Sequence, residues 1–280
     1  MITSVIEYKR SRPLLGTYFN VTISGQSLED APNPVVNGAL AEAARLEQIF
    51  SLYSNESILT LVNKQGLDIP TEVPKEFYYL LKLALRVWAA SDGAFNPFFP
   101  KNIGRHLEPY VFADQDECFL LCKRIDVPLD LNGIAKGYVV DRVVERITRE
   151  LPHVSGVVNA GGDLKFFNTQ KKCVNLRLGD PRSPVLRTIV SPMNCVATSS
   201  IATSLYNENS SSQYSLQLRR GLAEFDTVSV AANCCCIADS LTKVALYGEP
   251  ESIEKSANLF NAKILVFDKG GSVIESYGDQ

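Results

Sequence analysis

The stretch from Asp130 to Phe167 restricts the possible folds of this 280-residue chain more than any other. It starts as DLNGIAKGYVVD and continues as RVVERITREL, where valines and Ile147 recur at helical spacing. That spacing predicts a helix with one apolar stripe. VSGVVNAGGDLKFF follows, and its pattern indicates two strands joined by a glycine turn. A helix that leads into paired strands favours the α+β class.

The remaining segments fit the same class. Pro32 and Pro34 are expected to break the chain, and short β segments are expected to alternate with polar loops such as NENSSSQ over residues 175–230. The order of elements predicts one α+β domain over residues 1–280, or two closely packed halves, with mixed or antiparallel sheets flanked by helices. The expected elements are a strand over Tyr18–Ser24, helices over Val36–Phe50, Lys75–Ser91 and Cys236–Tyr247, a short helix ending near Asn63, and a last strand, AKILVFD.

Charge and composition argue against two classes of partner. The net charge is −3 and no run of Lys or Arg stands out, so no nucleic-acid surface is expected. No apolar run reaches roughly 18 residues, so no membrane-spanning helix is expected. The seven cysteines are odd in number and three are consecutive, which favours buried thiols in a reducing compartment. Since the N-terminus lacks a signal pattern, this predicts the cytoplasm, or the periplasm if a signal was removed.

Gly133 and Gly137 flank the segment that contains Lys136, just before an expected helix. Glycines allow positive φ and close backbone approach, and a helix N-terminus offers phosphate free N–H groups and a favourable dipole. The lysine could add a charge-assisted contact. The segment therefore fits either a diphosphate site or a plain strand-to-helix turn, and its spacing alone favours the turn.

Two further segments each carry polar groups with two interpretations. The glycines of Asn159–Asp163 suit a tight turn that needs positive φ, which is favoured, or a place where a ligand touches the backbone. Asp163 would turn or cap the backbone in the first case. Asp239 and Thr242 share one helix face and could hold Mg²⁺, which prefers oxygen ligands. The favoured alternative for this segment alone is that Asp239 complements the N-terminus of its helix.

Seven blocks of the sequence, taken in order, resemble those of one known family. They are LLGTYFNVTI, FSLYSNESILTLVN, SDGAFNPFFP, LDLNGIAKGYVVD, VVNAGGDL, NCVATSS and TVSVAAN…IADSLTKVAL. With these blocks the chain resembles the FAD:protein FMN transferase family, also called the ApbE family, from about Arg12 to Gly248. The most specific block is LDLNGIAKGYVVD.

The resemblance implies an α+β fold with a central cleft for FAD. Members of the family cleave FAD at its diphosphate with Mg²⁺ and attach FMN through phosphate to a Thr or Ser of a target protein, chemistry that depends on positioning and charge neutralisation. FAD, Mg²⁺ and an acceptor protein are therefore the implied ligands and partners. The resemblance places cofactor contacts at Leu15, Tyr53, Ala94, Phe95, Asn96, Asp130, Asn132, Lys136, Asn159, Gly161, Gly162 and Asp163, and metal ligation at the Gly133 carbonyl, Asp239 and Thr242.

The chain departs from the family pattern at several of these positions. Asn96 replaces a usual Asp, and Asn132 replaces a usual Gly. The metal block of the family is ADAxxT, and here Lys243 occupies the place of its Thr while Thr242 comes one residue early. Two outcomes are open: the Lys ammonium substitutes for part of the metal's charge, or the helix turns Thr242 inward.

A family segment of the form H-I-x-D-P-x-T-G has no counterpart here. Residues 213–230, QYSLQLRRGLAEFDTVSV, contain no histidine, and neither His106 nor His153 lies at a matching position. His153 is expected in a surface loop. Two functions follow: a divergent Mg²⁺-dependent flavin transferase, or a non-catalytic FAD-binding protein that carries or senses flavin. A structural partner with a vestigial cleft is a third interpretation.

Overall fold

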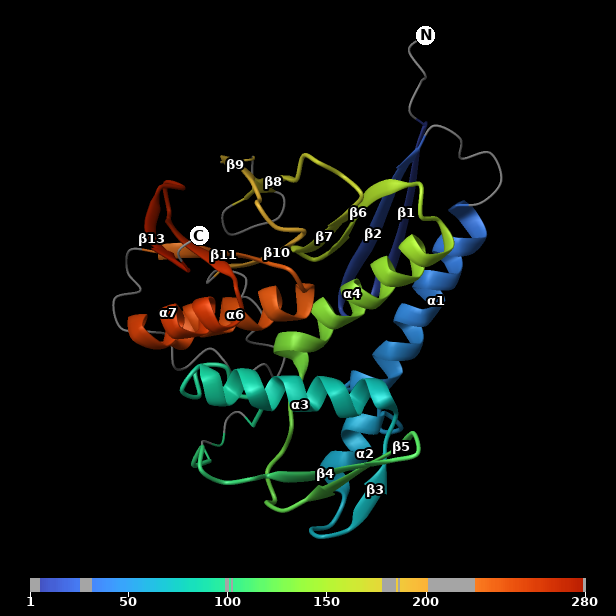
Figure 1. Cartoon of the computed structure of the whole chain (residues 1–280), viewed down its shortest axis with the longest axis vertical. Helices are drawn as coiled ribbons and strands as arrows, with labels where there is room; N and C mark the ends of the chain where they lie inside the picture. Colours follow the sequence, from blue (N-terminus) through green and yellow to red (C-terminus); the bar gives the residue numbers. More distant parts are fainter. Residues whose placement is uncertain are drawn as a thin grey trace.

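An antiparallel sheet forms the centre of the computed structural model, which describes residues 6–25, 32–98, 101, 103–177, 185, 187–200 and 225–278 (Figure 1). Every described strand pair is antiparallel, so of the two predicted sheet types only the antiparallel one is seen in the described residues. The sheet has the order β1 (Ile6–Leu14), β2 (Thr17–Gly25), β6 (Ser155–Ala160), β7 (Asp163–Phe167), β10 (Cys195–Ser200), β11 (Phe225–Ala232), β12 (Lys263–Asp268) and β13 (Val273–Tyr277).

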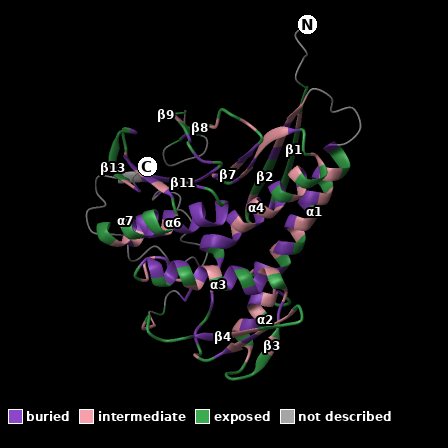
Figure 2. Cartoon of the chain, viewed as in Figure 1, coloured by how far each residue is buried: buried purple, intermediate pink, exposed green. Residues whose placement is uncertain are grey.

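Three helices pack against one face of this sheet. They are α1 (Pro32–Phe50), α4 (Asn132–Glu150) and α6 (Cys235–Tyr247). Helix α4 contacts α1, α6, β6 and β7, and α6 contacts β10 and β11. Each of these helices has a series of buried residues, and α6 is buried over most of its length (Figure 2). Two more helices, α3 (Lys75–Ala90) and α7 (Pro250–Leu259), pack on α4 and α6 respectively and contact each other.

Smaller elements complete the fold. The sheet β3 (Pro70–Glu72), β5 (Cys118–Lys123), β4 (Tyr110–Gln115) lies beyond α3, next to α2 (Ile58–Lys64) (Figure 1). The pair β8 (Cys173–Leu176) and β9 (Arg187–Val190) covers the face of the large sheet opposite the helices. Side chains alternate between the two faces, since Phe167 joins the helix-side core while its neighbour Phe166 packs with the buried residues of β8.

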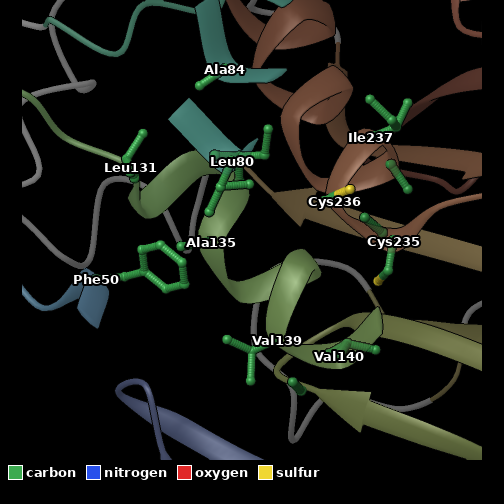
Figure 3. Packing of buried hydrophobic residues seen from close by; sticks show 14 of the residues in the cluster. Phe50, Leu80, Ala84, Leu131, Ala135, Val139, Val140, Cys235, Cys236 and Ile237 are labelled. Carbon is green, nitrogen blue, oxygen red and sulfur yellow. The ribbon is translucent and has the colours of Figure 1, made fainter. Parts of the chain in front are cut away.

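Helix α4 is the central element of the core. Its buried residues, among them Ala135 and Val139, belong to one cluster with Phe50 of α1, Leu80 of α3 and Cys236 of α6 (Figure 3). Helices α4 and α6 approach each other closely at Gly137, where an added Cβ would lie 2.6 Å from Cys235 C and 2.8 Å from Cys236 Cα. Glycine is thus required here by helix-to-helix packing. Gly133 and Gly137, which were expected before the helix, both lie inside it, and neither has positive φ.

The predicted helices and the glycine hairpin are confirmed within a few residues. The start of α1 and several peripheral elements differ from the prediction. Pro32 and Pro34 lie in the first turn of α1, where a missing N–H costs nothing, instead of breaking the chain. Strands β1, β3 and β13 and helix α7 were not predicted; β1 and β13 are edge strands and mostly not buried. The loop NENSSSQ lies outside the described residues. No helix in the described ranges is both long and apolar enough to cross a membrane.

Candidate functional site

Four charged side chains from three separate segments meet between α4, α6 and the sheet. They are Lys136, Asp163, Asp239 and Lys243, called the charge cluster below. Lys136 Nζ lies 3.1 Å from Asp163 Oδ2, and Lys243 Nζ donates to Asp239 Oδ1 at 3.0 Å. Asp239 Oδ2 accepts from the Gly137 N–H at 3.3 Å, which ties α6 to α4. The three polar segments that the sequence analysis treated separately thus form one site.

The backbone explains why these four side chains meet. Lys136 precedes Gly137, where the backbones of α4 and α6 approach too closely for a side chain. Asp239 and Lys243 are four residues apart on α6 and therefore share one face of that helix. Asp163 is the first residue of β7, directly after the glycine turn, and pairs with Ala197 of β10 in the sheet below. Helix packing and strand register together bring the cluster into one place.

Lys243 is surrounded by oxygen atoms. Its ammonium donates to Thr242 Oγ1 at 2.9 Å and to Ser199 Oγ at 3.3 Å, in addition to Asp239 Oδ1. The Ser199 hydroxyl donates to Thr242 Oγ1 at 2.9 Å, and the Thr242 hydroxyl donates to the Asp239 carbonyl at 2.7 Å. An ammonium has three N–H donors, and all three are used. Thr242 turns inward, as one of the two alternatives expected, and Lys243 bonds to it, so the two alternatives do not exclude each other.

Burial and mutual repulsion perturb the two carboxyl groups unequally. Asp163 is buried, and this burial, followed by the nearby Asp239 carboxylate, raises the pKa of Asp163 to about 7. The ammonium groups of Lys136 and Lys243 act in the opposite direction but do not prevent the rise. Burial would lower the pKa of Lys136, but the Asp163 and Asp239 carboxylates outweigh it and raise that pKa above its ordinary value. The Asp163 carboxyl can therefore exchange a proton near neutral pH while Lys136 stays charged.

The N-terminus of α6 is capped by a residue that the sequence analysis did not assign. Asp141 of α4 accepts from the Cys235 N–H and the Cys236 N–H, each at 3.0 Å, and pairs with Lys165 Nζ at 2.5 Å. The expectation that Asp239 complements this helix N-terminus is therefore wrong, because Asp141 fills that role and Asp239 lies one turn further along. The signal was present in the sequence as the last Asp of DLNGIAKGYVVD.

The residues predicted for Mg²⁺ do not fit that ion as they stand. Gly133, Asp239 and Thr242 do lie together, since a Cβ on Gly133 would be 3.4 Å from Lys243 Cγ. However, the Lys243 ammonium occupies the position among the oxygens that a cation would take. Magnesium needs oxygen ligands at about 2.0–2.1 Å in octahedral geometry and would meet repulsion from this ammonium. No cluster of three or more His, Cys, Asp or Glu side chains suited to a metal occurs in the described ranges.

Two tight turns lie side by side at one end of the sheet. Leu15, with φ of 52°, and Gly16 join β1 to β2, while Gly161 and Gly162, with φ of 60° and 101°, join β6 to β7. A Cβ on Gly161 would lie 2.5 Å from Thr17 Oγ1, so the turns are in contact. The favoured interpretation of the glycine pair as a tight turn is confirmed. Asn159, whose Oδ1 accepts from the Gly162 N–H at 3.1 Å, stabilises this turn.

The loop over residues 94–98 lies against the start of α4. The Phe95 ring is fully buried and would be 3.1 Å from a Cβ on Gly133. Asp130 donates its backbone N–H to Pro97 O at 2.8 Å, and its Oδ1 accepts from the Asn132 N–H at 2.7 Å. Burial raises the pKa of Asp130 although the Asn132 N–H stabilises its charged form. Asp130 thus caps α4 and fixes the loop beside it.

The other predicted members of this loop have local roles. Asn96 donates through Nδ2 to Lys101 O at 3.1 Å and accepts from the Phe98 N–H at 2.9 Å, so it holds the loop closed. The Ala94 methyl lies at the end of α6, where a Cβ on Gly248 would be 3.2 Å from it. The structure therefore gathers the predicted residues of the loop, α4 and α6 into one region.

Some predicted residues lie apart from the charge cluster. Tyr53 is 75% exposed in the loop between α1 and α2, and no contact found in the described residues joins it to the cluster. His106 and His153 are exposed in turns, which confirms the surface position expected for His153. Residues 213–230 contain no histidine where the family has one, and most of this segment, residues 213–224, lies outside the described residues. Ser199, which the sequence analysis did not select, is a member of the site through its contact with Lys243.

Comparison with known proteins identifies the family. The model of the ApbE family matches residues 15–103 and 100–266. A FAD:protein FMN transferase of Treponema pallidum (strain Nichols) is 27% identical in an alignment of length 212 that covers 64% of this chain and 55% of that protein. The chain thus spans about half the length of this relative.

Solved structures share the fold. The ApbE protein of Thermotoga maritima has a TM-score of 0.74 at 22% identity, covering 97% of each chain. The flavinyl transferase ApbE of Pseudomonas stutzeri has a TM-score of 0.73 at 19% identity, covering 99% of this chain and 95% of that one. For the flavin transferase ApbE of Vibrio cholerae the values are 0.72 and 18%, with coverage of 99% and 98%. These matches confirm the predicted α+β fold, and with the family match over residues 15–266 they show that this chain belongs to the ApbE family.

Proposed function

We propose that the chain is a flavin transferase that uses FAD as donor and attaches FMN through phosphate to a Thr or Ser of a target protein. Family membership supports the general activity. The observation that carries the proposal is the charge cluster, because Lys136 and Lys243 bring two ammonium groups to one place between α4 and α6. A diphosphate is a dianion whose oxygens accept charge-assisted hydrogen bonds from such groups.

The cluster suits the reaction because its two ammonium groups, although each is paired with a carboxylate, can also donate to phosphate oxygens on which negative charge develops. The acceptor hydroxyl oxygen forms a bond to the phosphorus on the FMN side of the diphosphate. The bond from that phosphorus to the bridging oxygen breaks, the electron pair leaves with AMP, and the hydroxyl proton passes to solvent. Ammonium groups fixed in a largely buried site stabilise the departing phosphate more strongly than they would in water. Lys136 and Lys243 are 27% and 20% exposed, so both can reach a bound diphosphate.

The other predicted cofactor residues support the same location. The turn at Leu15, the turn at Gly161 and the start of α4 all border the region between the sheet and α4. Helix α4 also presents its N-terminus there, where the helix dipole favours an anion. The magnesium part of the prediction is not included in the proposal, because the Lys243 ammonium takes up the oxygens that the ion would need.

One observation favours a second candidate function, a non-catalytic FAD-binding protein. Both histidines of the chain are exposed, and neither belongs to the charge cluster. If the transfer step needs an imidazole at the diphosphate, this chain would bind FAD without transferring FMN. The charge cluster would then serve to hold the diphosphate alone.

The deciding experiment incubates the purified chain with FAD and individually purified candidate acceptor proteins. Transfer predicts that the acceptor gains the mass of one FMN and that AMP is released in equal amount. FMN in place of FAD is the matched control, because it lacks the diphosphate and cannot yield AMP. Tight FAD binding without AMP release or a mass change in any acceptor would contradict the transferase proposal and support the carrier.

A further inference from the structure

The ammonium of Lys243 has the surroundings of a bound cation. One carboxylate oxygen and two hydroxyl oxygens, from Asp239, Thr242 and Ser199, lie 2.9–3.3 Å from Nζ. These are hard oxygen donors of the kind that Mg²⁺ prefers. They come from α6 and from β10, so the ammonium also links the helix to the sheet.

Further hydrogen bonds fix the oxygen atoms around the Lys243 ammonium. Asp239 and Thr242 are buried, with exposed fractions of 1% and 0%. Asp239 is fixed by the Gly137 N–H, and Thr242 by its own bond to the Asp239 carbonyl and by Ser199. A buried carboxylate without a cation would be costly, so this one needs either the ammonium or a metal ion. Because the ammonium fills the position, the need for a metal ion is already met.

The lysine is also placed to reach a ligand. Its side chain is 20% exposed, whereas its carboxylate partner is almost fully buried, so the ammonium lies at the outer side of the group. Its stem passes Gly133 near the start of α4, where a side chain would come within 3.4 Å of Lys243 Cγ. The Ser199 bond is the longest of the three, and the ammonium can exchange it for a phosphate oxygen while keeping Asp239 and Thr242.

From this geometry we propose that Lys243 takes the place of a divalent cation, so that the chain binds the FAD diphosphate and transfers FMN from it without Mg²⁺. The inference rests on the proposed function, since it concerns the same site. The transfer step is unchanged: the acceptor oxygen bonds to the FMN phosphorus and AMP leaves with the electron pair. Lys243 would donate a hydrogen bond to the diphosphate and neutralise part of the charge that gathers on AMP.

The test compares FAD binding by calorimetry, and AMP release by chromatography, in excess EDTA and in millimolar Mg²⁺. Protein freed of metal, as checked by elemental analysis, is expected to show the same FAD affinity and the same AMP release in both. Lys243→Met keeps the stem but removes the charge, and should weaken FAD binding in EDTA about tenfold or more, as expected for one lost charge-assisted hydrogen bond. Lys9→Met, at an exposed ion pair on β1, is the matched control and should change nothing.

A reciprocal variant separates charge replacement from a merely structural role. Lys243→Thr frees the oxygens of Asp239, Thr242 and Ser199, so its FAD binding should be weak in EDTA and recover when Mg²⁺ is added. A lysine that only supports the fold would give no such recovery. If Lys243→Met does not fold, the comparison of the wild type in EDTA and in Mg²⁺ still decides whether FAD binding needs the metal ion. Lys243→Arg, which keeps the positive charge, serves as the second variant.

The outcomes distinguish the two proposals. Wild-type FAD binding that is lost in EDTA and restored by Mg²⁺ overturns the inference while the proposed function stands. The same follows if Lys243→Met binds FAD as tightly as the wild type in EDTA. Binding that is indifferent to metal, with no AMP released and no acceptor modified, supports the role of Lys243 in binding and overturns transfer. If the wild type binds no FAD in either condition, both proposals fail.

Discussion

Replacing Gly137 with alanine tests whether α4 and α6 are held at the distance that the charge cluster needs. The new Cβ would meet the backbone of α6, namely the carbonyl oxygen and carbon of Cys235 and the Cα of Cys236, the latter two at 2.6 and 2.8 Å. Backbone atoms cannot rotate aside, so the helices must separate. Separation would also lengthen the bond from the Gly137 N–H to Asp239, already 3.3 Å.

The expected size follows from opposing terms. Alanine gains about 1 kcal/mol over glycine in a helix interior. Overpacking costs about 1–3 kcal/mol, and the upper end applies where the obstacle is backbone. A weakened buried hydrogen bond adds about 1 kcal/mol to the cost. The free energy of unfolding of Gly137→Ala should therefore fall by about 3 kcal/mol, the sum of these terms.

Gly38→Ala in α1 is the matched control, because it makes the same chemical change in another helix. Its Cβ would meet only the guanidinium of Arg146, a flexible side-chain end, at 2.7 Å. The helix gain of about 1 kcal/mol should then be kept. Urea unfolding should place the two variants on opposite sides of the wild type, with free energies of unfolding about 4 kcal/mol apart. Equal or greater stability of Gly137→Ala would refute the packing argument, and so would a destabilised Gly38→Ala that matches it.

Three further predictions concern single residues. Asp130→Ala should weaken FAD binding measured by calorimetry, while the unfolding free energy falls by only about 1 kcal/mol for the lost cap; unchanged FAD affinity would contradict the site assignment. Asp141→Asn should lower the unfolding free energy in urea by about 2 kcal/mol, since the α6 N-terminus loses its charged cap; an unchanged midpoint would argue against that role. A hydrogen bond from the Cys236 thiol lowers the pKa of exposed Cys234 to about 7. Alkylation of Cys234 by iodoacetamide, followed by mass spectrometry, should therefore rise as pH passes through about 7, and Cys236→Ala should move the rise to higher pH; a midpoint near 9 in the wild type would count against it.

Local sequence patterns were sufficient to predict the elements that bury one apolar face and expose the other. Helices such as α3 and α4 carry apolar residues at helical spacing, and the hairpin at Gly161 needs positive φ, so both could be predicted from sequence. Strand β1 could not, because IEYKRSRPL lies at the sheet edge and is mostly exposed. Its polar residues show no alternation, and its pairing depends on a neighbour rather than on its own pattern.

The sequence was sufficient to select most residues of the charge cluster, but not to predict which of them form hydrogen bonds with each other. Motif order selected Lys136, Asp163 and Asp239, which do meet. The spacing of Asp239 and Lys243 also allowed an ion pair on one helix face. The proposal that Lys243 replaces Mg²⁺ depends in part on the position of Ser199, which comes from β10 and completes the surroundings of the lysine. That contact depends on how α6 lies on the sheet, and no local pattern encodes it.

The pairing of β2 with β6 also shapes how the chain folds during synthesis. Strand β2 ends at Gly25, but its sheet neighbour begins only at Ser155. At usual rates of translation, the ribosome needs roughly 10 s to make the intervening chain. Throughout that time the inner edge of β2 has unpaired N–H and C=O groups that another chain could bind. A nascent chain stalled before Ser155 would thus be open to misassembly, and completion of β6 and its pairing with β2 removes that risk.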